Sequence, residues 1–216
     1  MLSFAFIKLS LGFLTTLKIF ALTLVFSLPL GLLVAFGSMS KFKPLKFLIK
    51  GIVWVIRGTP LMLQILVVCY GPGLIGLPAM RNTMLAVIIA FVINYACYFS
   101  EIYRGGIESV SKGQFEAGQV LGMSKSQIFF KVVLMQVIRR ILAPMSNEVI
   151  TLVKDTSLAN TIMITEIIKA SKDLASGYGL ELLPILLGAA LFYLVFVGAL
   201  TLLFGFIEKK LSYYKV

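Results

Sequence analysis

The sequence contains no histidine and little charge. Among its 216 residues only 13% are charged, 59% belong to the hydrophobic set, and the mean hydropathy is +1.00. A soluble domain of this size exposes too much surface to hide that apolar fraction. The composition therefore excludes an ordinary cytosolic enzyme, a nucleic-acid-binding module and a disordered chain, and it predicts an integral membrane protein.

The missing histidine also excludes imidazole metal sites, Ser-His and Cys-His nucleophile pairs, and histidine proton relays. Cys69 and Cys97 lie in apolar stretches without CxxC spacing, so we expect small buried side chains rather than a disulfide or a metal site. The phosphate-binding pattern G-x-x-x-x-G-K-S/T does not occur. We expect no catalytic residue, no metal and no cofactor bound by this chain.

Apolar windows long enough to cross a bilayer set the expected fold. A spanning helix needs about 20 mainly apolar residues. Such windows occur at about residues 19–40, 52–72, 82–100, 141–168 and 182–207, and the fourth is interrupted by Glu148, Lys154, Asp155 and Glu166. We expect an all-α integral membrane protein with five transmembrane helices, forming a single domain over residues 1–216.

The basic residues indicate the orientation. Thirteen of the 20 Lys and Arg residues fall in connections on one side of the membrane, and at most five fall on the other. An excess of basic residues marks the cytoplasmic side. We therefore expect a multi-pass protein with its N-terminus outside and its C-terminus in the cytoplasm. The thirteen are Lys41, Lys43, Lys46, Lys50, Arg104, Lys112, Lys125, Lys131, Arg139, Arg140, Lys209, Lys210 and Lys215.

The longest cytoplasmic connection, residues 101–140, has the pattern of a folded segment. Its apolar residues are spaced as short amphipathic helices require, and glycines at 113, 118 and 122 punctuate them. A disordered tether would be richer in polar residues. The apolar faces of these short helices are therefore expected to pack against something.

This connection resembles the EAA loop in the membrane subunits of ATP-binding-cassette importers. That loop reads Glu-Ala-Ala-x3-Gly and, nine residues later, Ile-x-Leu-Pro. Gly118 replaces the second alanine and Met135 replaces the proline, so the break that the proline makes before the fourth span is missing unless Pro144 supplies a later one. The matching residues are Glu116, Ala117, Gly118, Gly122 and Val132-Val133-Leu134-Met135.

Three further segments resemble the polar amino-acid branch of that family, the histidine, glutamine and arginine type of importer. They occur in order on the five-span frame, so the resemblance extends over most of the chain. The segments are Arg57-Gly-Thr-Pro-Leu-Met-Leu-Gln64, Glu101-Ile-Tyr-Arg-Gly-Gly-Ile107 followed by Gly113-Gln114-Phe115-Glu116, and Lys154-Asp155-Thr156-Ser157-Leu158.

The resemblance implies a type I importer permease in the bacterial cytoplasmic (inner) membrane. The chain would form half of a translocation path for small polar amino acids, and a second permease, identical or different, would supply the other half. Two cytoplasmic ATPase subunits would bind ATP and Mg and carry out hydrolysis, so this chain would not be an enzyme. An extracytoplasmic substrate-binding protein would deliver the amino acid. The remaining surroundings are lipid, and no nucleic acid is expected.

The resemblance also implies a coupling helix that docks in a groove on the ATPase. Gly113 and Gly122 would let the backbone turn sharply at its two ends. The Glu116 carboxylate in its first turn suits the helix dipole and can meet a basic partner residue. The alternative is a solvated amphipathic surface helix. The expected coupling residues are Gly113, Gln114, Phe115, Glu116, Ala117, Gly118, Leu121 and Gly122.

Polar residues of the fourth window mark the expected substrate path, because ionisable groups inside a bilayer are costly and usually face a polar interior. Asn147, Thr151 and Lys154 share one helical face, and Glu148 and Asp155 share the adjacent stripe. A zwitterionic amino acid needs acceptors for its ammonium and donors for its carboxylate, and backbone at a helix break supplies some of both. The expected path residues are Asn147, Glu148, Thr151, Lys154, Asp155, Thr156, Ser157, Thr59, Gln64 and Asn94.

Structural alternatives stay open for the charged members of this set. Lys154 and Asp155 either line the path or neutralise each other or partners at a helix interruption, and Glu148 either faces substrate or pairs with Arg139 or Arg140. The sequence does not decide between these roles.

Two further side chains have a structural interpretation. Asn94 suits an interhelical hydrogen bond. Arg57 is expected at the cytoplasmic end of its span, with its guanidinium reaching the lipid headgroups, and a substrate role is the alternative.

Two functional alternatives remain. An ion-gradient-driven secondary transporter predicts internal repeats and paired broken helices, and the sequence shows neither clear self-similarity nor a second broken span. An importer permease for a solute other than an amino acid would share the same motifs.

Overall fold

The computed structural model describes residues 2–78 and 80–211, and all regular structure in these ranges is helical. The predicted all-α fold is confirmed for this part of the chain, and Lys215 lies outside it. The elements are α1 (Leu2–Ser38), α2 (Lys43–Arg57), α3 (Leu61–Leu74), α4 (Thr83–Glu108), α5 (Lys112–Val120), α6 (Lys125–Ile128), the π-helix η1 (Phe129–Val133), α7 (Leu134–Asp155), the 3-10 helix η2 (Thr156–Ile162), α8 (Ile167–Tyr178) and α9 (Leu182–Leu211).

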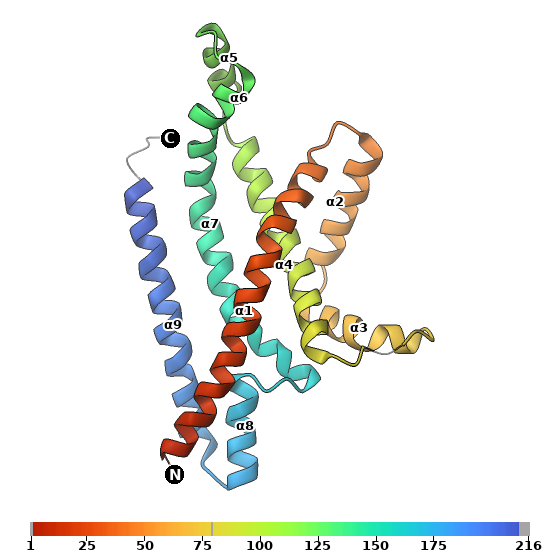
Figure 1. Ribbon diagram of the computed structural model, residues 1–216, viewed down its shortest axis with the longest axis vertical. Coiled ribbons are helices and arrows are strands. Elements are labelled where there is room, and N and C mark those ends of the chain that lie inside the picture. Colours follow the sequence, from red (N-terminus) through yellow and green to blue (C-terminus); the bar gives the residue numbers. More distant parts are fainter. Residues whose placement is uncertain (1, 79, 212–216) are drawn as a thin grey trace.

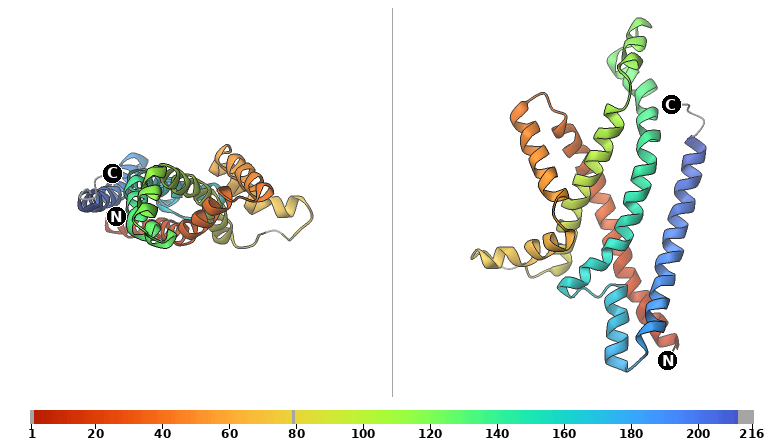
Figure 2. Two further views of the ribbon diagram at one scale, coloured as in Figure 1. Left: turned by 90° about the horizontal axis from the view of Figure 1, so that it is seen from above. Right: turned by 180° about the vertical axis from the view of Figure 1, so that it is seen from behind.

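The helices form an elongated bundle with the N- and C-terminal ends at opposite poles (Figure 1). α1 runs from the N-terminal pole toward the other, α2 turns back, and α3 projects sideways from the bundle, as the further views also show (Figure 2). α4 and α7 run antiparallel and meet the short helices α5 and α6 at one pole. α8 lies at the other pole, and α9 returns from it.

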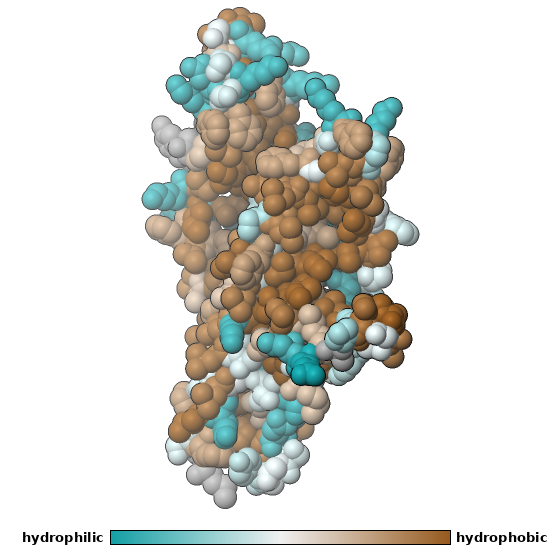
Figure 3. Space-filling model, turned by 45° about the vertical axis from the view of Figure 1, so that its right-hand side comes forward, coloured by the Kyte–Doolittle hydropathy of each residue, from teal (hydrophilic) through white to brown (hydrophobic). Residues whose placement is uncertain are grey.

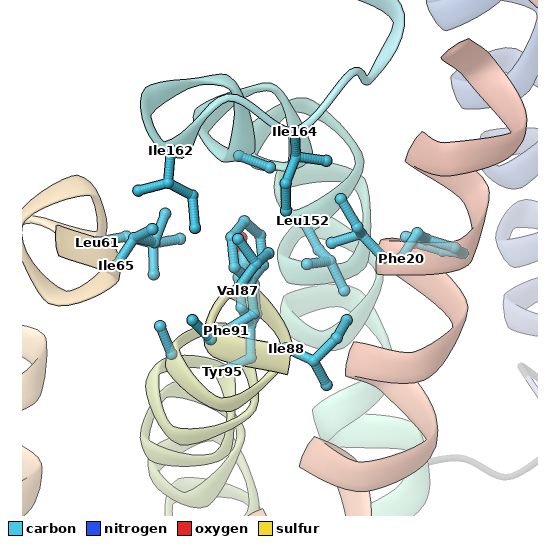
Figure 4. Close-up of a cluster of buried hydrophobic side chains, with 14 of the residues drawn as sticks. Phe20, Leu61, Ile65, Val87, Ile88, Phe91, Tyr95, Leu152, Ile162 and Ile164 are labelled. Carbon is cyan, nitrogen blue, oxygen red and sulfur yellow. The ribbon is translucent and has the colours of Figure 1, made fainter. Parts of the chain in front are cut away.

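Close packing between α1 and α4 holds the centre together. A Cβ added to Gly31 would lie 3.0 Å from the carbonyl oxygen of Ala96 and 3.0 Å from Cβ of Phe99, closer than most Cβ contacts, so glycine lets the two helices approach without displacing a neighbour. Beside this contact, buried side chains from α1, α3, α4, α7 and η2 form one cluster (Figure 4). Because lipid is as apolar as these side chains, dense packing rather than exclusion of water stabilises the cluster.

Three helices of the described chain are long and apolar enough to cross a bilayer: Ser3–Ser38 within α1, α4 and α9. α2 and α3 pass the same test only together, with a bend of 105° between them. α7 is not among these helices, and its 22 residues include several charged side chains. Figure 3 shows a largely apolar surface over the middle of the molecule, with polar side chains gathered toward its two poles.

The expected second span, 52–72, is not one helix. α2 ends at Arg57 and α3 begins at Leu61, because Pro60 has no backbone N–H and disfavours helical backbone at Thr59. A continuous apolar window conceals this break from hydropathy. The expectation that only the fourth span is broken is therefore wrong.

The expected fourth span, 141–168, is also not continuous. α7 ends at Asp155, and the next seven residues form η2. In η2 side chains bond to carbonyls three residues back, including Thr156 to Val153 and Ser157 to Lys154, and this pattern competes with the α-helical ladder. α8 then begins at Ile167.

Two further boundaries differ from the hydropathy windows. The first helix begins at Leu2 rather than near residue 19, because Lys8 and Lys18 interrupt an apolar window without interrupting a helix. α4 continues to Glu108 and α7 begins at Leu134, so the connection between them is shorter than residues 101–140.

Candidate functional site

The residues predicted for the site lie in two separate regions, one at the middle of the bundle and one at the pole that carries α5 and α6. In the first region, side chains from α2, α4 and α7 form what we call the polar face. Arg57, Asn147 and Lys154 are exposed there, and the others are partly buried. The polar face comprises Arg57, Tyr98, Asn147, Glu148, Thr151, Lys154 and Asp155.

Asp155 is held by a tyrosine of the neighbouring helix. The buried Tyr95 hydroxyl donates a hydrogen bond to Asp155 Oδ2 at 2.7 Å, where α7 gives way to η2. Among the described residues neither Lys154 nor Asp155 belongs to any of the four ion pairs, but the Lys154 charge acts on Asp155, so both roles of these two residues stay predictions. The next residue, Thr156, is fully buried, and its hydroxyl donates to the Val153 carbonyl at 2.6 Å.

Replacing Tyr95 with Phe is expected to destabilise the permease by about 1–3 kcal/mol, because a partly buried carboxylate loses its donor. Thermal unfolding of the purified protein in detergent measures the effect. Tyr103→Phe is the matched control on the same helix, since no hydrogen bond of its hydroxyl is seen in the described chain. Equal shifts in both variants would contradict the role assigned to the bond.

Arg57 is the last residue of α2, about 21 Å along the helix from Lys43. Its guanidinium lies 3.7 Å from the Glu101 carboxylate and 5.1 Å from the centre of the Tyr98 ring. This ion pair and this cation–π contact join α2 to α4, and contact of the exposed guanidinium with lipid headgroups stays a prediction.

The side chains of Thr59, Gln64 and Asn94 form one hydrogen-bond network. The Gln64 amide donates to the Thr59 hydroxyl at 2.9 Å and to the Ile56 carbonyl at 2.8 Å, and its oxygen accepts from Asn94 Nδ2 at 3.0 Å. This network ties the bend between α2 and α3 to α4. The interhelical interpretation of Asn94 agrees with the geometry.

Glu148 has no arginine partner from its own helix. Arg140 donates instead to the Ser109 hydroxyl at 2.9 Å, beyond the end of α4. The charges that act on Glu148 are Asp155 on α7 and Arg57 on α2. The polar face therefore combines two acceptor groups, Glu148 and Asp155, with two cationic donors, Arg57 and Lys154. This combination can meet both ends of a zwitterion.

The second region is the connection between α4 and α7, where Gly122 ends α5 as predicted, whereas Gly113 lies inside the helix that begins at Lys112. α5 ends in a Schellman motif: Gly122 has φ of 72°, its N–H donates to the Gln119 carbonyl at 2.9 Å, and the N–H of Met123 donates to the Gly118 carbonyl at 3.0 Å. Ser124 then caps α6 through a reciprocal bond pair with Gln127. Both features make a compact turn between the two helices.

The surface of α5 is more apolar than an aqueous position favours. Val120 is 88% exposed, Leu121 77% and Phe115 40%, and the pole carrying them is also rich in charged side chains. Exposed apolar groups clustered outside the apolar belt indicate an interaction surface. Of the predicted coupling residues, Gly118 alone is buried, and Gly113, Gln114, Glu116 and Ala117 are exposed with the others.

The motif's proline is replaced by Met135, and the helix is continuous at this position. No break precedes α7, since η1 continues directly into Leu134. Pro144 lies inside α7, which continues through it to Asp155. The irregularity in this segment is therefore the π-helix η1, rather than a break made by a proline.

Sequence comparison matches residues 27–213 to the family "Binding-protein-dependent transport system inner membrane component". The L-cystine transport system permease protein TcyB of Bacillus subtilis is 36% identical over 209 residues, covering 95% of this chain and 87% of the relative. The arginine transport system permease protein ArtQ of the same organism is 32% identical, covering 93% and 91%. The nopaline transport system permease protein NocM of Agrobacterium fabrum is 36% identical, covering 89% and 84%.

Solved structures give the same result. An amino acid ABC transporter crystallised with histidines matches with a TM-score of 0.85 and 28% identity, covering 94% of both chains. The inward-facing MetNI methionine ABC transporter matches with a TM-score of 0.65 and 16% identity, covering 94% of this chain and 92% of the other, which supports likeness of fold alone.

Proposed function

The chain belongs to the family of binding-protein-dependent transport system inner membrane components, and from that premise we propose that it is the permease subunit of an ATP-binding-cassette importer for polar amino acids. The observation that carries the proposal is full-length similarity to permeases named for cystine, arginine and glutamine transport. The chain has no phosphate-binding loop, so ATP hydrolysis belongs to a partner subunit.

The proposed topology has five crossings, made by α1, the α2–α3 pair, α4, α7 and α9. Its support is that the two described ends lie at opposite poles, as an odd number of crossings requires (Figure 1). The pole with α5 and α6 carries Lys112, Lys125 and Lys131, and the basic excess places it in the cytoplasm. The N-terminus and α8 are then outside, in a bacterial inner membrane.

The polar face is proposed to be this chain's half of the translocation path. Charges at such depth are tolerated where they face a partner or water rather than lipid. Arg57 is positioned to hold the substrate carboxylate, and Glu148 its ammonium or a cationic side chain. A second permease, identical or different, closes the path by presenting its own polar face.

The exposed apolar surface of α5 is proposed to dock on the cytoplasmic ATPase. Phe115, Val120 and Leu121 supply the contact, and Glu116 meets a basic partner residue. Closure of two ATPase subunits on ATP would displace α5 and open the path outward to an extracytoplasmic binding protein. Hydrolysis would return the path to the cytoplasmic side.

Reconstitution tests the function. The chain is co-expressed with its co-purifying subunits and placed in vesicles with ATP on the cytoplasmic face and the substrate-binding protein on the other, and uptake of labelled arginine, glutamine and cystine is measured. We expect uptake that needs ATP and persists with proton and sodium ionophores. Uptake that ionophores abolish and ATP does not support would favour a secondary transporter. ATP hydrolysis stimulated only by another solute class would overturn the amino-acid assignment.

A further inference from the structure

Gly118 is the one buried residue of α5. The helix is otherwise exposed along its length. A Cβ added to Gly118 would lie 2.6 Å from Cγ1 and 2.9 Å from Cδ1 of Ile128, distances that real Cβ atoms do not adopt. Ile128, the last residue of α6, therefore occupies the space in which a side chain at position 118 would sit.

Ile128 cannot readily move aside. It is 1% exposed, and its β-branched side chain has a restricted χ1 angle. It packs in a cluster with Val110, just beyond α4, and with Val133 and Val137 of the η1–α7 segment. One side chain thus touches α5 on one side and the ends of two long helices on the other.

A polar contact connects α5 to α7 independently. Gln136 of α7 donates a hydrogen bond to the Gln114 side chain of α5 at 3.3 Å. With Ile128, this gives α5 two connections to the helix that carries Glu148 and Asp155 at its far end. Displacement of α5 is therefore passed to α7 rather than absorbed in a flexible loop.

We propose that Ile128 is a positioning residue that fixes the angle of α5 against the ends of α4 and α7, and that Gly118 is the small residue this arrangement requires. The inference rests on the proposed coupling role of α5 and names the residue that transmits it. It also explains why glycine stands at the position where the loop that this segment resembles has alanine: an alanine here requires a smaller residue at 128.

A double-mutant cycle in the complete complex tests the proposal. Gly118→Ala is expected to lower transport per ATP hydrolysed about tenfold through overpacking, although alanine favours a helix more than glycine does. Ile128→Ala is expected to act similarly by leaving a void. The double variant is expected to recover to within about threefold of the unmodified protein, since each change compensates the other. Gly198→Ala, where a Cβ meets nothing within 4 Å, is the control.

The readouts separate this inference from the proposed function. Co-purification of the ATPase and its basal hydrolysis are expected to persist in Ile128→Ala, because Ile128 is buried and lies outside the proposed docking surface. An unmodified complex that neither hydrolyses ATP nor transports amino acids contradicts the proposed function itself. If the unmodified complex is active, normal coupling in Gly118→Ala, or a double variant no better than Gly118→Ala, overturns the inference.

A structural measurement covers the case in which Gly118→Ala fails to insert. Spin labels at the exposed positions Gln119 of α5 and Ala143 of α7, in a background without Cys69 and Cys97, report the placement of α5. Ile128→Ala is expected to broaden the distance distribution between the labels. An unchanged distribution would overturn the positioning role.

Discussion

Gly122→Val is expected to lower ATP-driven uptake by up to about thirtyfold while the permease remains inserted in the membrane. Gly122 has φ of 72°, and left-handed backbone costs an L-residue about 1–2 kcal/mol, with β-branched side chains at the upper end. A cost of about 2 kcal/mol lowers the equilibrium constant for the native turn about thirtyfold, which sets the upper limit of the expected loss. The Schellman motif would open, and the surface with Val120 and Leu121 would lose its orientation toward the ATPase.

Gly122→Asn separates this backbone effect from a general effect of adding a side chain. Asparagine tolerates left-handed backbone, and a Cβ at this position meets nothing within 4 Å. We expect its uptake to stay close to that of the unmodified complex. Uptake and ATP hydrolysis are compared in vesicles holding equal amounts of complex. Equal losses in both variants would show that docking contacts at position 122, rather than its conformation, are what matter.

Much of the fold was predictable from the sequence because composition and periodicity report on burial. The apolar windows located α4 and α9, and glycine spacing anticipated the end of α5 at Gly122 but not its beginning, since Gly113 lies inside the helix. Hydropathy could not find the break at Pro60, because the residues on both sides of it are apolar. Nor could it locate the end of α7 at Asp155, where side-chain hydrogen bonds to the backbone, and not polarity, change the type of helix.

The candidate site was partly predictable. The polar residues of α7 stand out in an apolar window, so Glu148 and Asp155 were identified directly. The partners of the site were missed: Tyr95 lies inside an otherwise apolar helix, and Glu101 belonged to a motif without an assigned contact. Pairs such as Tyr95 with Asp155, separated by 60 residues, depend on how helices pack, and a single sequence carries no signal for that.

The glycine at position 118, where the motif has alanine, is a second feature that the sequence alone does not explain. In the sequence, this glycine is a departure that weakens the resemblance to the motif. In the structure, the large side chain of Ile128, ten residues later, occupies the space that a side chain at position 118 would need. Such compensation is steric and local to the turn between α5 and α6. α7 then joins this packing at one end to the polar face at the other, so a single helix connects the two candidate regions.

Glu148→Gln is expected to change which amino acids the permease accepts. The side chain keeps its shape but loses the charge that would meet a substrate cation, and a hydrogen bond to a charged group contributes about 1.5–3 kcal/mol. Binding of arginine should therefore weaken about tenfold or more, and binding of glutamine should change little. Both are measured with labelled amino acids on the purified complex in lipid nanodiscs.

Glu181→Gln controls for the loss of one negative charge, since Glu181 is exposed next to α9 at the opposite pole from α5. It should leave both affinities unchanged. If Glu148→Gln weakens arginine and glutamine equally, Glu148 meets the α-ammonium common to both rather than a cationic side chain. If it alters neither, Glu148 lies outside the substrate site, and its negative charge offsets the positive charge of Arg57 on the polar face. The two affinities together thus distinguish contact with a cationic side chain, contact with the α-ammonium, and a position outside the substrate site.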